Sequence, residues 1–334
     1  MQHPLCFCCV VLIVLMSGSL CRAETVIIDC LITPDIYHFF KEREIKNTQI
    51  KIIHPGCFLS HPLFIDSNTS LSGEKGAQIQ QTFTLPDTVG VINISSGDST
   101  RAVSNVQISG VSFIGGAEKN GFAEHNPLIS IFNAHDVTLS NLNLTGFRGD
   151  GVYVGQGNVV SNHHIVIRNV IFDGVNFSNR NGISIIDGHD ILIDGNRFTR
   201  ISRKGMPGSI DLEPNTSLQR IYNIMISRNH FTDVHGMAAI VISLRHAGGT
   251  VPDNVTIKGN IFDKVVRGIL IKSAIPKIHV NNNFHIFDNR SSSASKGDYS
   301  ICNVNAATGN NLPAIEKYSD SCWKSLRINQ DVLQ

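Results

Sequence analysis

The chain has 334 residues, of which 42% are hydrophobic and 16% charged, with 28 Lys and Arg against 27 Asp and Glu. The charged fraction lies below the roughly 25% of an average soluble domain. A mean hydropathy of +0.03 argues against both a disordered chain and a polytopic membrane protein. The net charge of +1 gives no basic stripe, so nucleic acid is not an expected partner.

The N-terminal segment has the pattern of an export signal. An apolar run from Leu5 to Met16 is followed by small residues, and a cleavage position follows Ala23. The run is too short for a comfortable membrane span. We therefore expect residues 1–23 to be a signal peptide, the mature protein to be secreted or periplasmic, and no stable membrane anchor to remain after cleavage.

Export changes the interpretation of the cysteines, because four of the eight lie in the segment to be removed. The mature chain keeps an even number in an oxidising compartment. Three connectivities are open, and we expect the two local pairs, Cys30–Cys57 and Cys302–Cys322. No close Cys/His pair suggests a metal site.

Two short apolar patterns recur through the middle of the chain at intervals of 26 to 33 residues. The first is a small residue followed by three strand-like residues, as in Gly151-Val-Tyr-Val and Gly182-Ile-Ser-Ile. The second begins at an apolar residue such as Val137 or Ile165 and ends at an apolar residue, three times as Asn-x-Phe. Such short strands bury their apolar faces only when successive copies stack.

Stacked copies without intervening amphipathic helices predict an all-β fold, a parallel β-solenoid. We expect this domain over residues 24–290, including an N-terminal cap in which residues 35–46 form a short helix. Residues 291–334 are expected to form a C-terminal cap or tail.

The sequence resembles the pectate-lyase-like right-handed parallel β-helix superfamily. The opening coil (residues 50–58 and 70–77) is similar to the first turns of pectin-degrading relatives. The stretches Arg180-Asn-Gly-Ile-Ser-Ile and Ser209-Ile-Asp-Leu-Glu-Pro-Asn are similar to motifs of β-helix proteins that act on polysaccharides. The resemblance implies a single-stranded right-handed helix of about 8–10 coils. It leaves the reaction open, since the superfamily includes hydrolases, lyases, epimerases and adhesins, and their complete catalytic motifs are missing here.

Equivalent residues of neighbouring coils stack about 4.8 Å apart, so the repeat predicts which side chains meet. One outward column contains Tyr153, Ser184 and Asp211, and the next contains Glu213. Asp211 and Glu213 stand two apart on one strand and are expected on the same face. Paired carboxylates can supply the acid and the base or nucleophile of glycosidic cleavage, so they are the leading catalytic candidates.

Further candidates surround this pair. Asp187, close to the pair, and Asp150 could add catalytic carboxylates, although Asp150 could instead initiate a turn. Arg180, Arg245 and His246 could bind a uronate or an oxyanion, and Tyr153 could stack on a sugar ring. A solvated turn is the alternative for the two arginines, and an exposed tyrosine on a strand needs no special role.

The favoured hypothesis is an exported protein that hydrolyses glycosidic bonds in a polysaccharide. The alternatives are a lyase or uronate C5-epimerase on the same groove, or a non-catalytic carbohydrate-binding or adhesion protein. No cofactor is expected, although a lyase could use Ca²⁺ to neutralise a uronate, with the acidic residues as ligands. The sequence gives no indication of the oligomeric state.

Overall fold

A computed structural model describes residues 24–306, apart from 41–44, 85–88, 245–247, 274–277, 281–282, 295–298 and 303. The expected signal peptide (residues 1–23) therefore lies outside the described residues.

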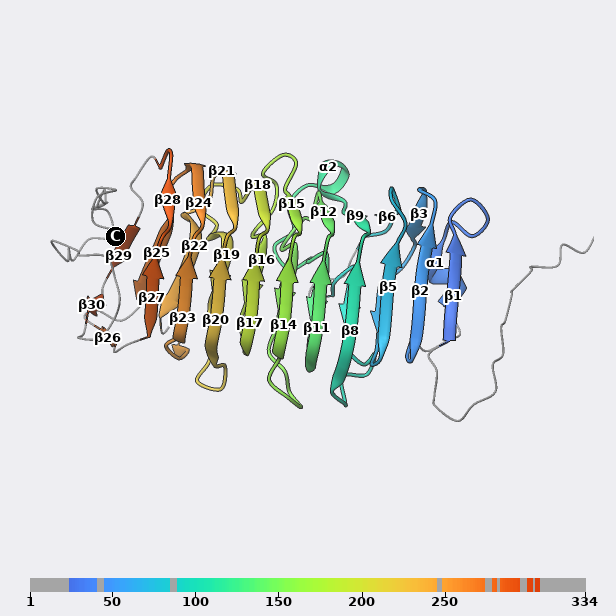
Figure 1. Cartoon of the computed structure of the whole chain (residues 1–334), viewed down its shortest axis with the longest axis horizontal. Helices are drawn as coiled ribbons and strands as arrows, with labels where there is room; N and C mark the ends of the chain where they lie inside the picture. Colours follow the sequence, from blue (N-terminus) through green and yellow to red (C-terminus); the bar gives the residue numbers. More distant parts are fainter. Residues whose placement is uncertain are drawn as a thin grey trace, which may run out of the picture.

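Three long parallel sheets run along the molecule, and each successive coil adds one strand to each sheet (Figure 1). The first sheet contains β1 (Glu24–Asp29), β2 (Thr48–Ile53), β5 (Thr69–Gly73), β8 (Val103–Ser109), β11 (Ala134–Ser140), β14 (His163–Arg168), β17 (Gly188–Asp194), β20 (Ile221–Ser227), β23 (Asp253–Lys258) and β27 (Phe284–Phe287).

The second sheet contains β3 (Cys57–Leu59), β6 (Gln78–Gln81), β9 (Ser112–Ile114), β12 (Asn143–Thr145), β15 (Ile171–Asp173), β18 (Arg197–Ile201), β21 (His230–Val234), β24 (Ile261–Val265) and β28 (Arg290–Ser291). The third sheet contains β4 (Leu63–Ile65), β7 (Ile92–Ile94), β10 (Ile129–Ile131), β13 (Val152–Val154), β16 (Ile183–Ile185), β19 (Gly208–Leu212), β22 (Ala238–Leu244), β25 (Ile269–Ser273) and β29 (Tyr299–Cys302). Two further strands, β26 (Ile278–Val280) and β30 (Val304–Ala306), pair with each other.

The predicted solenoid is confirmed, including its register. The first sequence pattern forms the third sheet, where Val152 pairs with Ile183 and Ile183 with Ile210. The second pattern begins in the first sheet, where Val137 pairs with Ile165, and ends in the second sheet, where Phe172 pairs with Phe198. All of these pairings are parallel, as a helix of stacked coils requires.

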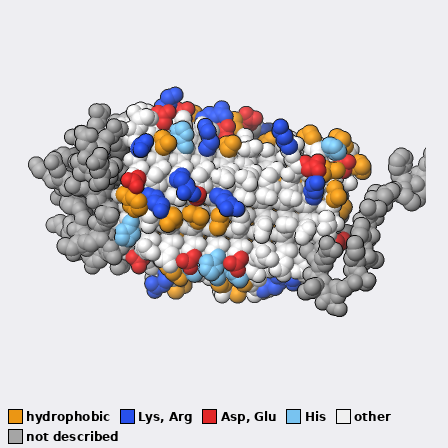
Figure 2. All heavy atoms as spheres, in the orientation of Figure 1, with side chains coloured by type: hydrophobic (Ala, Val, Ile, Leu, Met, Phe, Trp, Pro, Cys, Tyr) orange, Lys and Arg blue, Asp and Glu red, His pale blue; other side chains and the backbone are white. Residues whose placement is uncertain are grey.

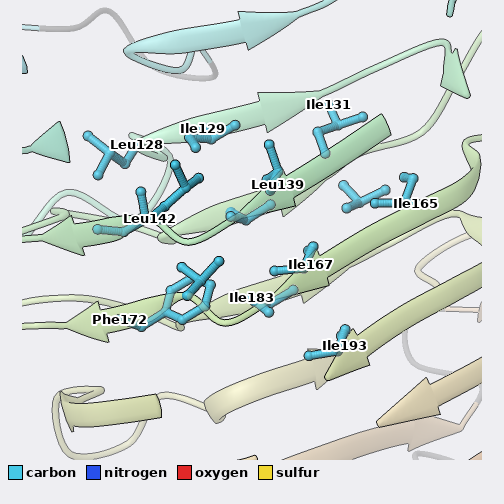
Figure 3. Close-up of a cluster of buried hydrophobic side chains, with 14 of the residues drawn as sticks. Leu128, Ile129, Ile131, Leu139, Leu142, Ile165, Ile167, Phe172, Ile183 and Ile193 are labelled. Atoms are coloured by element: carbon cyan, nitrogen blue, oxygen red, sulfur yellow. The ribbon is translucent and has the colours of Figure 1, made fainter. Parts of the chain in front are cut away.

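The core is a continuous set of aliphatic and phenylalanine columns enclosed by the three sheets (Figure 3). Phe172, Phe198 and Phe231 stack with ring centroids 4.6 and 4.8 Å apart. Their burial explains the repeated phenylalanine at the end of the second pattern, because each ring packs on the ring one coil away.

A ladder of buried asparagines forms the sharp turn between the first and second sheets. Asn196, Asn229, Asn260 and Asn289 bond to one another in sequence, and each side-chain oxygen accepts from the preceding asparagine. The residue before each of them has a positive φ of 54–65°, which makes the corner tight. The asparagine of Asn-x-Phe therefore satisfies the buried amides of this corner.

The N-terminal end carries the expected helix and disulfide. Helix α1 (Ile36–Phe40) buries Ile36 and Phe40 in the core. Cys30 and Cys57 form a disulfide, which confirms the first expected pair. The second pair needs Cys322, which lies outside the described residues. Helix α2 (Ala117–Asn120) is a single turn. In the part of the chain that the structure describes, no helix is long and apolar enough to cross a membrane.

Candidate functional site

The outer face of the third sheet brings the main sequence candidates together. Tyr153, Ser184 and Asp211 pair across successive strands, as the repeat predicts. Ile210 and Leu212 point into the core, so Asp211 points away from it. The outer face is covered at this point, however, because Asp211 has no exposed area and Glu213 is also buried.

The guanidinium of Arg180 is the centre of a polar cluster. Its Nη2 lies 2.9 Å from Oε2 of Glu213 and 3.7 Å from Oδ2 of Asp211. Its Nη1 lies 3.2 Å from Oδ2 of Asp150, and donates to Oγ of Ser184 at 3.0 Å. Three carboxylates thus share one cation that is itself 12% exposed.

Asp211 stands out among these carboxylates. Neither of its oxygens has a hydrogen-bond partner among the described residues. Burial raises the pKa of Asp211 well above its ordinary value, the nearby charge of Glu213 raises it further, and Arg180 opposes both effects. A buried acid in this environment holds its proton at a pH where an exposed aspartate has lost it.

Asp150 combines two tasks. Its Oδ1 accepts the backbone N–H of Asn181 at 3.1 Å, one coil away, so it bonds a turn amide as well as Arg180. Burial raises the pKa of Asp150 above its ordinary value, although Arg180 and the hydrogen bonds oppose this. Both sequence interpretations of Asp150 are therefore compatible with its position.

Tyr153 lies beside the cluster. Burial raises its pKa to about 12, and the charges of Asp150 and Glu213 contribute in the same direction. The phenol therefore stays protonated through the neutral range and can donate a hydrogen bond. It cannot serve as an anionic base at neutral pH.

The sequence analysis missed Glu124. This residue lies in the connection between β9 and β10, and its Oε1 is 3.5 Å from Nε of Arg180. At 41% exposure it is the most accessible carboxylate of the cluster. The connection belongs to no repeat, so column alignment could not place it. Arg148 fixes this connection by donating to the carbonyls of Asn120 and Gly121, and it is the residue through which the position of Glu124 could have been suspected.

Asp187 is placed differently from the pair. Its Oδ1 accepts the backbone N–H of Arg220 at 2.9 Å, on the way into the first sheet. Among the described contacts, none joins Asp187 to Arg180 or Asp211. Its position favours the turn role. Arg245 and His246 lie outside the described residues.

Among the described residues, no group of three or more His, Cys, Asp or Glu side chains could hold a metal ion. The carboxylates of the cluster face a guanidinium instead. The cluster can transfer protons and stabilise positive charge. The guanidinium of Arg180 opposes the rise in the pKa of Asp150 and Asp211.

Comparisons with known proteins agree with the parallel β-helix fold. The family described as the right handed beta helix region matches residues 90–312, more than half of the chain, and the chain belongs to this family. No curated protein matches its sequence.

Several solved structures share the fold. One is a hyperthermoactive exopolygalacturonase from Thermotoga maritima, with 14% identity, a TM-score of 0.56, and coverage of 84% of this chain and 80% of that one. Another is the catalytic domain of a GH87 α-1,3-glucanase in complex with nigerose, at 15% identity and a TM-score of 0.58, covering 89% of this chain and 57% of that one. A third is an N-terminal fragment of bacteriophage Phi29 gene product 12, at 13% identity and a TM-score of 0.56, covering 79% and 53%. The chain spans little more than half of the last two structures. At these identities the likeness is one of fold.

Proposed function

We propose that this protein hydrolyses glycosidic bonds in a polysaccharide, with Asp211 as the proton donor and Glu213 as the base or nucleophile. The observation that carries the proposal is that two carboxyls in unlike environments stand two residues apart, Asp211 in β19 and Glu213 directly after this strand. Asp211 is buried without a hydrogen-bond partner among the described residues and has a raised pKa. Glu213 accepts a hydrogen bond from the guanidinium of Arg180 at 2.9 Å.

A carboxyl that holds its proton, with a second carboxyl two residues away, matches the needs of glycosidic cleavage, which requires a proton donor and a base or nucleophile. Asp211 donates its proton to the glycosidic oxygen as the bond from that oxygen to the anomeric carbon breaks. Glu213 either takes a proton from an attacking water or attacks the anomeric carbon itself, and water then releases the sugar. In the base route Glu213 then passes its proton to solvent and Asp211 regains one from solvent; in the nucleophile route Asp211 takes its proton back from the water that releases the sugar. Either route adds one water across the broken bond.

Access to Asp211 requires a rearrangement on binding. The Asp211 oxygens are covered in the free protein, and the nearest described cation is Nη2 of Arg180 at 3.7 Å. The outer contact of Arg180 is its ion pair with the exposed Glu124. We propose that substrate displaces this ion pair, which lets the guanidinium move and the glycosidic oxygen reach Asp211.

Other observations support the substrate class and the location. Two of the structures of similar fold bear the names of an exopolygalacturonase and an α-1,3-glucanase. The Cys30–Cys57 disulfide suits an oxidising compartment, and with the N-terminal apolar run it supports secretion or a periplasmic location.

Mass spectrometry of products tests the proposal. Purified protein is incubated with a panel of neutral and acidic polysaccharides, beside the D211N variant and a D190N control from the first sheet. Fragments carrying an added water, lost in D211N and kept in D190N, are expected. Unsaturated fragments would replace hydrolysis with a lyase reaction. Intact polymer throughout would contradict the catalytic proposal and leave an epimerase or a binding protein.

A further inference from the structure

Two aromatic rings lie side by side on the outer face of the third sheet, next to the Arg180 cluster. Phe132 follows strand β10, and Tyr153 lies in the middle of β13 on the next coil. Their ring centroids are 5.7 Å apart and the ring planes make an angle of 51°. Both side chains are partly exposed, whereas Ser130, Ser184 and Asp211 in the same stretch of the face are buried. The rings are therefore more accessible than their neighbours in this stretch of the face.

Gly155 forms the floor beneath both rings. A Cβ atom at this position would lie 2.0 Å from Cε1 of Phe132 and 2.7 Å from Cε1 of Tyr153. Two hydrogen bonds fix the backbone of Gly155: its N–H donates to the carbonyl of Ile131, and its carbonyl accepts from the side-chain amide of Asn162. Because residue 155 has no side chain, the ring of Phe132 can pack against its backbone next to Tyr153.

The pair has a defined position relative to the proposed catalytic carboxyls. Ser184 separates Tyr153 from Asp211 along the column, so the two are two coils, or roughly 10 Å, apart. Phe132 and Gly155 occupy the neighbouring outward column, in which Glu213 lies two coils beyond Gly155. A chain of sugars lying along the solenoid and crossing the carboxyls would also cross the two rings.

The charges next to the rings favour an uncharged ligand. The donors of Arg180 are directed at Glu124, Asp150, Ser184 and Glu213 of the protein itself. Asp150 and Glu213 also act electrostatically on Tyr153. A uronate bound on the rings would therefore lie near these carboxylates and be repelled by them. The guanidinium of Arg180 could not offset this repulsion, because it already pairs with carboxylates of the protein.

We propose that Phe132 and Tyr153 on Gly155 form a sugar-binding subsite for an uncharged pyranose, on the N-terminal side of the bond to be cleaved. The inference rests on the proposed function and adds to it the class of sugar and the direction of the groove. The apolar C–H face of a pyranose packs on the exposed ring of Phe132, and the Tyr153 hydroxyl hydrogen-bonds to the sugar.

Calorimetric titration of the non-cleaving D211N protein tests the subsite. The probes are three neutral trisaccharides (nigerotriose, maltotriose and cellotriose) and trigalacturonate. We expect at least one neutral probe to bind more tightly than trigalacturonate. Adding Phe132→Ala should then weaken its binding about tenfold, since an aromatic contact of this size is removed. Adding Phe132→Tyr should retain the affinity.

Two more variants give the test its controls. Gly155→Ala, which must displace both rings, should weaken binding as Phe132→Ala does, with circular dichroism confirming the fold. Phe64→Ala is the matched control, because Phe64 is 39% exposed in the same outward column as Tyr153 but three coils away. It should leave trisaccharide binding unchanged.

The outcomes separate this inference from the proposed function. Unchanged affinity in the Phe132→Ala protein, tighter binding of trigalacturonate, or no binding of any neutral probe would overturn the subsite. Continued hydrolysis by a Phe132→Ala protein with wild-type affinity would remove the subsite and leave the hydrolase. Binding that depends on Phe132 in a wild-type protein that cleaves no polymer would support the subsite and contradict the hydrolase.

Discussion

The first and third sheets both carry aspartates on their outer faces, and the two faces treat them in opposite ways. On the first sheet, Asp136 and Asp190 lie 2.7 Å from Nδ1 of His135 and His189, and these hydrogen bonds lower the pKa of both carboxyls. At the third sheet, burial raises the pKa of Asp211 in β19 and of Asp150, which lies in the connection before β13. The same residue type therefore has a lowered pKa on one face and a raised pKa on the other.

The histidines of the first sheet form a regular stack. His135, His163 and His189 lie 4.8 and 4.9 Å apart between ring centroids, and Tyr222 continues the stack at 4.4 Å. Figure 2 shows histidine side chains flanked by acidic ones along the lower edge of the molecule. Acids on this face keep both solvent and hydrogen-bond donors, whereas Asp211 has neither among the described residues. The environment therefore decides which acids can donate a proton at neutral pH.

Replacing the acid on each face should give the largest difference. Asp211→Asn removes the proposed proton donor and should lower the hydrolysis rate about 10²–10⁴-fold, the usual contribution of general acid catalysis. Asp190→Asn should leave the rate within about twofold, because Asp190 contacts His189 and Asn223 on a different sheet. Initial rates on the polymer that wild type cleaves measure both. Equal losses in the two variants would contradict the assignment.

Removing the shared cation should test how far the third-sheet cluster depends on charge. Arg180→Met leaves three buried or nearly buried carboxyls without their counter-ion, so we expect about 3–5 kcal/mol less unfolding free energy in urea. Adding Glu213→Gln should restore part of this loss, because one unpaired charge is removed. A loss that the second substitution does not reduce would show that packing, not charge, explains the effect of Arg180.

The pH dependence of stability should have opposite signs on the two faces. The pKa of Asp211 is raised in the folded protein, so this group lowers stability as pH rises from its unfolded pKa, about 3.9, through its folded pKa. The pKa of Asp190 is lowered, so its contribution is present above the unfolded pKa and is lost as pH falls through the folded pKa.

Thermal unfolding across this pH range can separate the two contributions. Relative to wild type, Asp211→Asn should gain stability as pH rises above about 4. Asp190→Asn should instead lose stability relative to wild type at lower pH, as pH rises toward about 4, and the effect should be small because this carboxyl is solvated. Parallel curves for wild type and Asp211→Asn would mean that Asp211 ionises normally in the folded protein.

The smallest effect is expected at the exposed edge of the cluster. Glu124→Gln removes the outer partner of Arg180, whose contact is 3.5 Å and partly solvated, so the unfolding free energy should change by less than about 1 kcal/mol. If Glu124 holds Arg180 over Asp211 in the free protein, the same change should lower KM without lowering kcat. A decreased kcat would instead give Glu124 a part in the chemical step.

The repeat made the fold predictable to the level of individual pairs. The columns through Val152, Ile183 and Ile210 appear in the structure as aligned, because a parallel solenoid converts sequence spacing directly into strand register. The Cys30–Cys57 disulfide was expected because these two cysteines are a local pair in the sequence.

The site was predictable only in part, because its chemistry depends on the connections outside the repeat. The columns placed Asp211 two coils from Tyr153, but they did not indicate that Asp211 is covered. Glu124 and Phe132 reach the face from a connection and from a strand end, so strand alignment gave them no special status. Arg180 was expected to meet the substrate, and its position among the protein's own carboxylates follows from contacts that no single-strand pattern encodes.

A carboxyl ¹³C NMR titration of the Asp211–Glu213 pair, assigned by comparing wild type with Asp211→Asn, tests the central claim most directly. We expect a carboxyl resonance that is lost in the variant and that titrates well above the ordinary aspartate pKa, because Asp211 keeps its proton in its buried position. A signal for Asp211 that is fully ionised at and below ordinary aspartate pKa values would remove the proton donor, and with it the proposed mechanism.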